Sequence, residues 1–372
     1  MNGPINSDDI LISIGALFDS DRWWIYKGEL VREFEDKFSR FHGCASGVST
    51  CNGTVPFEIV LRGLGIGPGD KVILPAYDFY SLPKSISNVG AIPVFADVCE
   101  TNPTIAPIEI EDLLATGAKA VVVAHICGAV AEVDTIAEIC RGSGVYLIED
   151  CAQAAGARYA GRPVGSFGIA GLFSFGGIKL LTSGQGGMIT TSDEELYEKC
   201  YAMTNRGIDS TGKMNSFGIV GDNYQMSELS AATLIPQLDL LEKLSSRRED
   251  IMSLLDTSIS AIEGIVPVSH FDRADRRAQM RYCFYYQYAE EDEYALDSLV
   301  NRAMKGGIPL QRLHKCVWND ERLAGMYKDQ RKYPNSARAE ASLIGIHHSD
   351  ILKGFEYWKD ALNSCVYDPE KR

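Results

Sequence analysis

One lysine stands alone in a run of small and apolar residues. Residues 171–187 read GLFSFGGIKLLTSGQGG, and Lys179 is their only charged residue. An ammonium group in such surroundings loses hydration, and desolvation lowers its pKa. A lysine that is neutral near physiological pH can attack a carbonyl group or act as a base. The alternative is a surface lysine beside a glycine-rich turn, and this segment alone does not separate the two.

An acidic residue closes an apolar run earlier in the chain. Residues 145–148 are predicted to form a buried strand that ends at Glu149 and Asp150. Burial raises the pKa of an aspartate unless a cation faces it, and a protonated pyridine nitrogen is such a cation. A pyridine cofactor needs a lysine for its aldehyde, a carboxylate for its ring nitrogen and a cradle for its phosphate. Lys179 and Asp150 fit the first two needs, although Asp150 could also be a helix N-cap.

The phosphate cradle has a candidate at residues 52–54. Asn52, Gly53 and Thr54 precede a predicted helix, where free backbone N–H groups and the helix dipole suit a phosphate. An ordinary N-cap is the alternative. The glycines at 63–69 close this helix and lack the spacing of a dinucleotide loop.

The elements around these residues predict an α/β fold. Strands at 71–75, 92–95, 120–125 and 145–148 alternate with helices, and two further strands lie within 167–175 and at 188–190. This alternation is typical of a doubly wound, mostly parallel sheet. Such sheets bind ligands at the carboxyl ends of their strands, and Phe79 and Asp150 both fall at such ends.

The chain is long enough for two domains. A long helical pattern covers 226–252, with a bend expected at Pro236. We expect a large domain with an N-terminal arm over 1–250. A smaller α+β domain is expected over 251–372.

Composition excludes several classes of protein. The 372 residues carry a formal net charge of −14, which argues against nucleic acid and anionic membranes as partners. The ten cysteines show no CxxC pair, so neither a metal site nor a disulfide framework is expected. Free cysteines, with no signal peptide and no membrane-spanning run, favour the cytoplasm.

Several ordered motifs stand out in the sequence: Asn52-Gly53-Thr54, residues 65–77 (GIGPGDKVILPAY), 90–97 (GAIPVFAD), 148–154 (IEDCAQA), 161–168 (GRPVGSFG), 173–187 and 223–228 (NYQMSE). Together they resemble one family, the DegT/DnrJ-type sugar aminotransferases. These enzymes depend on pyridoxal 5'-phosphate and have the fold-type I architecture. The resemblance extends from about Trp23 to at least Gln237, and more weakly to the C-terminus.

The resemblance implies a role for each matching residue around the cofactor ring. Lys179 would form the Schiff base and move the proton. Asp150 would pair with the ring nitrogen, Gln153 would lie near the ring hydroxyl, and Phe79 would stack on the ring face.

The resemblance also implies how the phosphate is held. The hydroxyl groups of Thr54 and Ser174 and the backbone amide of Val55 would bind it. Asn223 would reach the phosphate of the neighbouring subunit, which implies a homodimer with shared active sites.

The implied reaction moves an amino group from glutamine or glutamate to a keto-sugar, keto-cyclitol or related cyclic ketone, in a natural-product pathway such as antibiotic biosynthesis. One alternative is an aromatising or dehydrating enzyme like 3-amino-5-hydroxybenzoate synthase, which the segments at 22–24, 332–335 and 347–348 resemble. A non-catalytic regulator or partner subunit that binds the cofactor is the other. We expect His347 and His348 to be loop or packing residues, with a catalytic role as the less favoured alternative.

Four positions depart from the family pattern. Gln225 stands where the family commonly has arginine, and Gln185 stands where it commonly has glutamate. Gly176 and Gly177 are unusually small and are expected to leave room beside Lys179. These departures mark where substrate contacts could differ.

Overall fold

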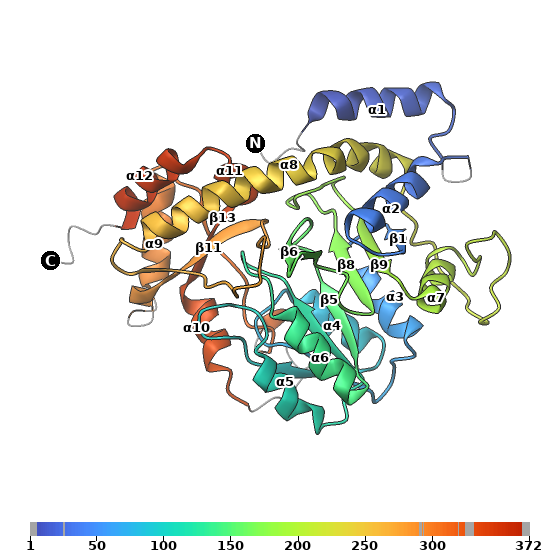
Figure 1. The fold of residues 1–372 in the computed structure, drawn as a ribbon, viewed down its shortest axis with the longest axis horizontal. Coiled ribbons are helices and arrows are strands. Elements are labelled where there is room, and N and C mark those ends of the chain that lie inside the picture. The colour runs from blue at the N-terminus through green and yellow to red at the C-terminus, as the bar shows by residue number, and fades with distance from the viewer. Residues whose placement is uncertain are drawn as a thin grey trace.

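A seven-stranded sheet forms the centre of the chain (Figure 1). The computed structural model describes residues 6–24, 27–289, 292, 294–318, 320–323 and 331–366. Across the sheet the strands follow the order β1 (Ser46–Thr50), β9 (Gly187–Thr191), β8 (Ala170–Ser174), β5 (Tyr146–Asp150), β4 (Ala120–Ala124), β2 (Lys71–Pro75) and β3 (Ile92–Ala96).

The sheet is mostly parallel, as the alternation of strands and helices predicts. Strands β3, β2, β4, β5 and β8 run in one direction, whereas β9 is antiparallel to both of its neighbours. All five residues of β4 are buried, which explains its unbroken apolar run. Strand β1 has the sequence SGVST, and it escaped prediction because it contains no such run.

Helices cover both faces of the sheet, so the apolar core forms two layers, one between each face and its helices. One layer contains Phe34 and Phe38, and the other contains Phe57 and Val60. The helices that surround the sheet are α2 (Leu30–Phe41), α3 (Val55–Gly63), α4 (Ser81–Asn88), α5 (Pro107–Leu114), α6 (Val133–Ser143) and α7 (Glu194–Thr204). A two-stranded ribbon, β6 (Arg158–Tyr159) with β7 (Arg162–Pro163), joins β5 to β8.

A smaller antiparallel sheet follows in the C-terminal part. Its strands lie in the order β10 (Ile265–Pro267), β11 (Arg281–Tyr286), β13 (Leu343–His347) and β12 (Leu310–Arg312). The helices of this part are α9 (Ala295–Lys305), α10 (Pro334–Ser342), α11 (His348–Ile351) and α12 (Phe355–Val366). Two 3-10 turns, 287–289 and 321–323, complete it.

One long helix, α8 (Glu228–Ile259), connects the two sheets (Figure 1). It packs against α1 (Ser7–Asp19) and α2 at one end and against α11 and α12 at the other. Because α8 continues through residue 250, the division of the chain at that point stays a prediction. None of the described helices is long and apolar enough to cross a membrane.

A buried histidine makes the fold sensitive to acid. His42 is fully buried, its Nδ1 lies 3.1 Å from the Phe38 carbonyl oxygen, and its Nε2 accepts the Gly156 N–H. Burial lowers the pKa of His42 to about 3. The unfolded chain therefore binds a proton below about pH 6.5 that the folded chain does not, and stability is lost as the pH falls.

We expect His42→Gln to reduce the acid sensitivity of the fold. At pH 5 the wild-type His42 lowers the free energy of unfolding by about 2 kcal/mol. This follows from a slope of about 1.4 kcal/mol for each pH unit below the unfolded pKa of about 6.5. Glutamine keeps a donor and an acceptor but does not titrate. Urea unfolding at pH 7 and pH 5 should show a smaller difference in the variant, and an equal difference would contradict the assignment.

Candidate active site

A cavity of about 300 Å³ opens at the carboxyl ends of β2, β4, β5 and β8. This is the edge at which parallel sheets bind ligands. Residues in and beside the small sheet, Met280 and Arg281 among them, line it from the other side. Six of the eight predicted site residues line this cavity: Thr54, Phe79, Asp150, Gln153, Ser174 and Lys179.

The amine of Lys179 has the low pKa that its sequence surroundings predict. This pKa is lowered to about 8, mainly by burial. Asp150 and Asp78 oppose the lowering, and the nearby cation of Arg281 contributes to it. His347 makes a 2.9 Å hydrogen bond through Nε2 to the Ile178 carbonyl oxygen, which fixes the backbone before the lysine. A large share of this amine is therefore neutral near pH 8.

The alternation of β5 gives its last two acids different environments. Asp150 faces the cavity and accepts the Ala152 N–H at 2.8 Å. Burial raises its pKa, although the Ala152 hydrogen bond and the nearby Lys179 and His125 oppose this. A buried carboxyl group beside a buried amine suits a cationic partner in the cavity.

Glu149 lies away from the cavity and holds the surrounding backbone. Its two carboxylate oxygens accept the N–H groups of Gly165, Phe167 and Gly168 at 2.7–2.8 Å. His125 accepts the Ala131 N–H through Nδ1, so its Nε2 donates to Glu149 at 3.2 Å. His125 and Glu149 form a compact group with Cys151, as in some metal sites. The carboxylate is already satisfied by these donors, so the group is structural.

The N-terminus of α3 forms one end of the cavity. Asn52 caps it, because its Oδ1 accepts the N–H groups of Thr54 at 2.9 Å and Val55 at 3.1 Å. A phosphate would take the Val55 amide only if Asn52 released it, so this role stays a prediction. Gly53 lies directly against Ser174, and a Cβ at Gly53 would collide with that side chain. The backbone therefore approaches Ser174 as closely as a cradle for a small anion requires.

An aromatic ring and an amide complete the cavity wall. Phe79 is 43% exposed, which is unusual for a phenylalanine at the edge of a buried sheet. Gln153 lies deeper, where its Nε2 donates to Nε2 of His314 at 3.0 Å. The ring of His314 also meets Phe79 edge-on, with 6.0 Å between the centroids. His314 comes from the small sheet side and carried no motif that sequence reasoning could have used.

A second acid in the cavity, Asp78, was also missed as a site residue. Its Oδ1 accepts the Phe79 N–H at 2.6 Å, and its Oδ2 is buried without a hydrogen-bond partner among the described residues. Burial raises the pKa of Asp78 well above its usual value, and the negative charge of Asp150 raises it further. The sequence feature that could have identified Asp78 is its position directly before Phe79, the aromatic residue at the strand end.

We expect Asp78→Asn to stabilise the protein at pH 8, before any ligand is added. The unfolded carboxyl group loses its proton near pH 4 while the folded one retains it, so the wild type loses stability as the pH rises. Removing this penalty should raise the free energy of unfolding by about 1–3 kcal/mol.

The matched control for Asp78→Asn is Asp97→Asn. Asp97 is equally buried, but it accepts hydrogen bonds from Asn335 and Ser336. Its replacement should destabilise the protein. Urea unfolding at pH 8 measures both variants, and a destabilised Asp78→Asn would contradict the prediction.

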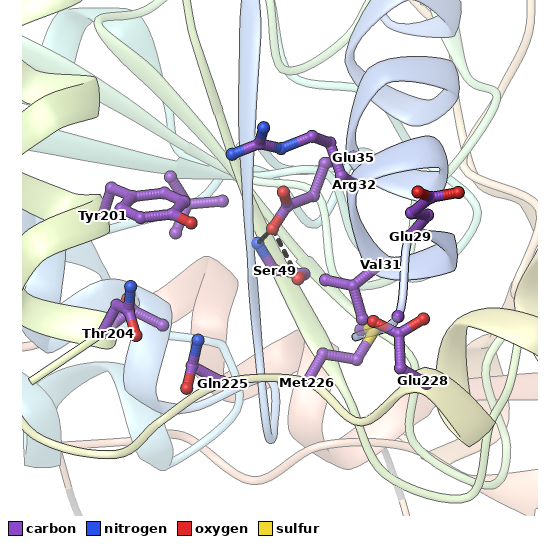
Figure 2. Close-up of a pocket in the computed structure, with 13 residues that line it drawn as sticks. Glu29, Val31, Arg32, Glu35, Ser49, Tyr201, Thr204, Gln225, Met226 and Glu228 are labelled. Carbon is purple, nitrogen blue, oxygen red and sulfur yellow. Dashed lines mark hydrogen bonds between the residues drawn. The ribbon is translucent and has the colours of Figure 1, made fainter. Parts of the chain in front are cut away.

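A second cavity, of about 220 Å³, lies between α2, β1, α7 and the start of α8 (Figure 2). Glu35 faces it and accepts two hydrogen bonds from Ser49, and burial raises the pKa of Glu35 to about 7. Gln225 lines this cavity and accepts a hydrogen bond from Arg206. The departure at Gln225 therefore lies outside the Lys179 cavity.

The other departures do lie beside Lys179. Gln185 lines the Lys179 cavity. A Cβ at Gly177 would meet no atom within 4 Å, but neither Gly176 nor Gly177 lines the cavity, so the expected room beside the lysine stays a prediction. Asn223 is exposed and outside the cavity, where it bridges to Asn205, so its role in a partner subunit stays a prediction.

The family comparison identifies the chain. The model of the DegT/DnrJ/EryC1/StrS aminotransferase family matches residues 10–356. The chain belongs to this family. It is a pyridoxal 5'-phosphate-dependent aminotransferase with the fold-type I architecture.

Its relatives are named for an aminobenzoate, a sugar and a cyclitol. 3-Amino-5-hydroxybenzoate synthase of Amycolatopsis mediterranei is 29% identical, over 90% of this chain and 88% of the relative. GDP-perosamine synthase of Caulobacter vibrioides is 33% identical, over 67% of each chain. L-Glutamine:2-deoxy-scyllo-inosose aminotransferase of Micromonospora echinospora is 34% identical, over 71% of this chain and 66% of the relative.

A crystal structure of 3-amino-5-hydroxybenzoic acid synthase superposes with a TM-score of 0.90. The two chains are 26% identical, and the match covers 98% of this chain and 97% of the other. This fold agreement extends through the small sheet, where the sequence resemblance was weaker.

Proposed function

We propose that the enzyme transfers an amino group from glutamine or glutamate to a keto-sugar, keto-cyclitol or related cyclic ketone in a biosynthetic pathway that makes a natural product. The observation that carries this proposal is the single cavity that unites Lys179, Asp150, Phe79 and Gln153. Bound there, pyridoxal 5'-phosphate supplies an electron-accepting ring and stores the amino group between the two half-reactions.

Each residue of the cavity has a separate role in this proposal. Lys179 would attach the cofactor through its neutral amine and would move a proton to and from the substrate carbon. Asp150 would face the ring nitrogen and keep it protonated, and the ring of Phe79, which is exposed, would stack on one face. Gln153 would lie near the ring hydroxyl group, and its amide is oriented by His314.

The phosphate would lie at the N-terminus of α3. The hydroxyl groups of Thr54 and Ser174 and the Val55 amide would bind it, and the positive end of the helix dipole would favour its charge. The close approach of Gly53 to Ser174 supports this placement, since both flank the same end of the cavity.

Visible absorbance of the cofactor-loaded enzyme tests the proposal. L-Glutamine or L-glutamate should bleach the band in the first half-reaction, and a panel of cyclic ketones should restore it in the second. Ping-pong kinetics should follow. Failure of both amino acids to change the spectrum would refute glutamine and glutamate as the donors.

A second candidate is a reaction like that of 3-amino-5-hydroxybenzoate synthase. The near-complete coverage of that relative and the TM-score of 0.90 favour it. Conversion of an added hydroxylated amino-cyclohexenone to an aromatic ring, with loss of water, would separate this candidate from simple transfer. A regulator without activity is disfavoured because both Lys179 and Asp150 are present in the cavity.

We also propose a homodimer with shared active sites, in the cytoplasm. The segment that carries Asn223 exposes large apolar side chains: Val220 is 95% exposed and Met214 is 73% exposed. Burial of such side chains in a symmetric interface would stabilise a dimer. The ten free cysteines agree with a reducing compartment.

Complementation between two inactive variants tests the shared site. Lys179→Ala and Asn223→Ala each damage a different part of one composite site. Mixed subunits should regain up to about a quarter of the wild-type activity, because half of the dimers are hybrids and each has one intact site. No recovery after subunit exchange, which mass spectrometry would verify, would contradict the arrangement.

A further inference from the structure

We propose that Arg281 binds the α-carboxylate of the amino donor and thereby selects amino acids as donors. This inference rests on the proposed function and adds a specific contact to it. It assigns a role to a residue of the small sheet that carries no sequence motif.

The position of Arg281 places a cation in the Lys179 cavity. Arg281 is the first residue of β11, paired with His347 across the small sheet, and it lines the cavity opposite the large sheet. Its Nη1 donates to Gln311 at 2.5 Å, which fixes the guanidinium plane. Its Nε is buried and has no hydrogen-bond partner among the described residues. Such an N–H normally finds an acceptor, so a ligand is the missing partner.

The charges of the cavity favour an anion at this place. Among the described lining residues, Lys179 and Arg281 are the only lysine or arginine. The two carboxyl groups, Asp78 and Asp150, come from strands of the large sheet instead. Arg281 lies close enough to Lys179 to lower its pKa. An anion bound by Arg281 therefore sits beside the reacting amine.

The bonds of the two substrates decide which anion this is. In an amino-acid donor the carboxylate carbon is bonded directly to the carbon that carries the amine. A cation near Lys179 can therefore reach that group while the amine reacts. A phosphate carried by a sugar acceptor is several bonds from its ketone carbon. A guanidinium edge also matches the two oxygens of a carboxylate in geometry.

Arg281→Gln and Arg281→Lys test the inference with three probes. L-Glutamine and L-glutamate carry the carboxylate, and L-glutaminol has a hydroxymethyl group in its place. The concentration that half-saturates bleaching of the visible band should rise about 10- to 100-fold for the effective amino acid in Arg281→Gln. For L-glutaminol it should change little. Arg281→Lys should restore part of the affinity for the amino acid that Arg281→Gln loses. Lysine keeps the positive charge but lacks the two parallel N–H donors of the guanidinium group.

The matched control is Arg312→Gln. Arg312 lies on the adjacent part of the small sheet, but it pairs with Asp297 at the surface. Arg312→Gln should leave the half-saturating concentrations of all three probes unchanged. Equal weakening of the amino acids and L-glutaminol in Arg281→Gln, or no weakening at all, would overturn the inference. A wild-type enzyme that responds to none of the probes would instead refute the proposed function, and the inference with it.

Discussion

Lys179→Ala is expected to lower the rate of amino transfer by at least about 10⁴-fold, since one residue supplies both the attachment of the cofactor and the proton transfer. The cavity offers no second lysine among its described lining residues. Absorbance of the cofactor-loaded variant and a single-turnover assay with L-glutamine measure the effect. The visible band of the wild type should be lost or shifted.

The control for this variant is Lys199→Ala. Lys199 lies on α7, outside the cavity, and pairs with Glu195 one helical turn away. It should leave both the spectrum and the rate unchanged. A Lys179→Ala variant with the wild-type spectrum and half-reaction would show that Lys179 is not the attachment point.

Asp150→Asn is the second change with a large expected effect. Asparagine is of equal size and can still accept the Ala152 N–H, but it cannot keep a ring nitrogen protonated. We expect kcat/KM to fall on the order of 10²- to 10³-fold, the range seen when one preorganised electrostatic contact is removed from an active site. The variant should still retain cofactor through the phosphate end of the cavity. Steady-state kinetics and a cofactor titration measure the two properties separately.

Glu149→Gln provides the contrast, because it changes the neighbouring acid on the same strand. Its amide would bring a donor against backbone N–H groups that now donate to the carboxylate. We expect a loss of stability from Glu149→Gln and a loss of catalysis from Asp150→Asn. The opposite pattern would mean that the two acids have been assigned to the wrong faces of β5.

The parts of the site that the sequence predicted are those carried by short segments at strand ends. Asp150, Ser174 and Lys179 follow apolar runs, and the parallel sheet brings such ends to one edge. Arg281 and His314 could not be found in this way, since they reach the cavity only through the packing of the small sheet. The contacts between distant segments, rather than any local pattern, define that side of the site.

The fold likewise divides into elements that their own sequence predicts and elements that depend on their neighbours. The strand at 71–75 was predicted with its observed bounds because it is buried on both faces. Strands β12 and β13 were not predicted, because β12 is only three residues long and β13 is an apolar run directly after a helix. Short elements of this kind depend on their neighbours for stability more than on their own composition.

Helix α8 connects the two sides of the cavity. Its 32 residues span about 48 Å, and Pro236 interrupts its hydrogen bonding within the first third. The part beyond Pro236 is about 35 Å long, so a change of about 10° in the bend would displace its last turn by about 6 Å. The small sheet is attached to that end through β10 and would move with it. A slight bend in one helix would thus set how far Arg281 stands from Lys179.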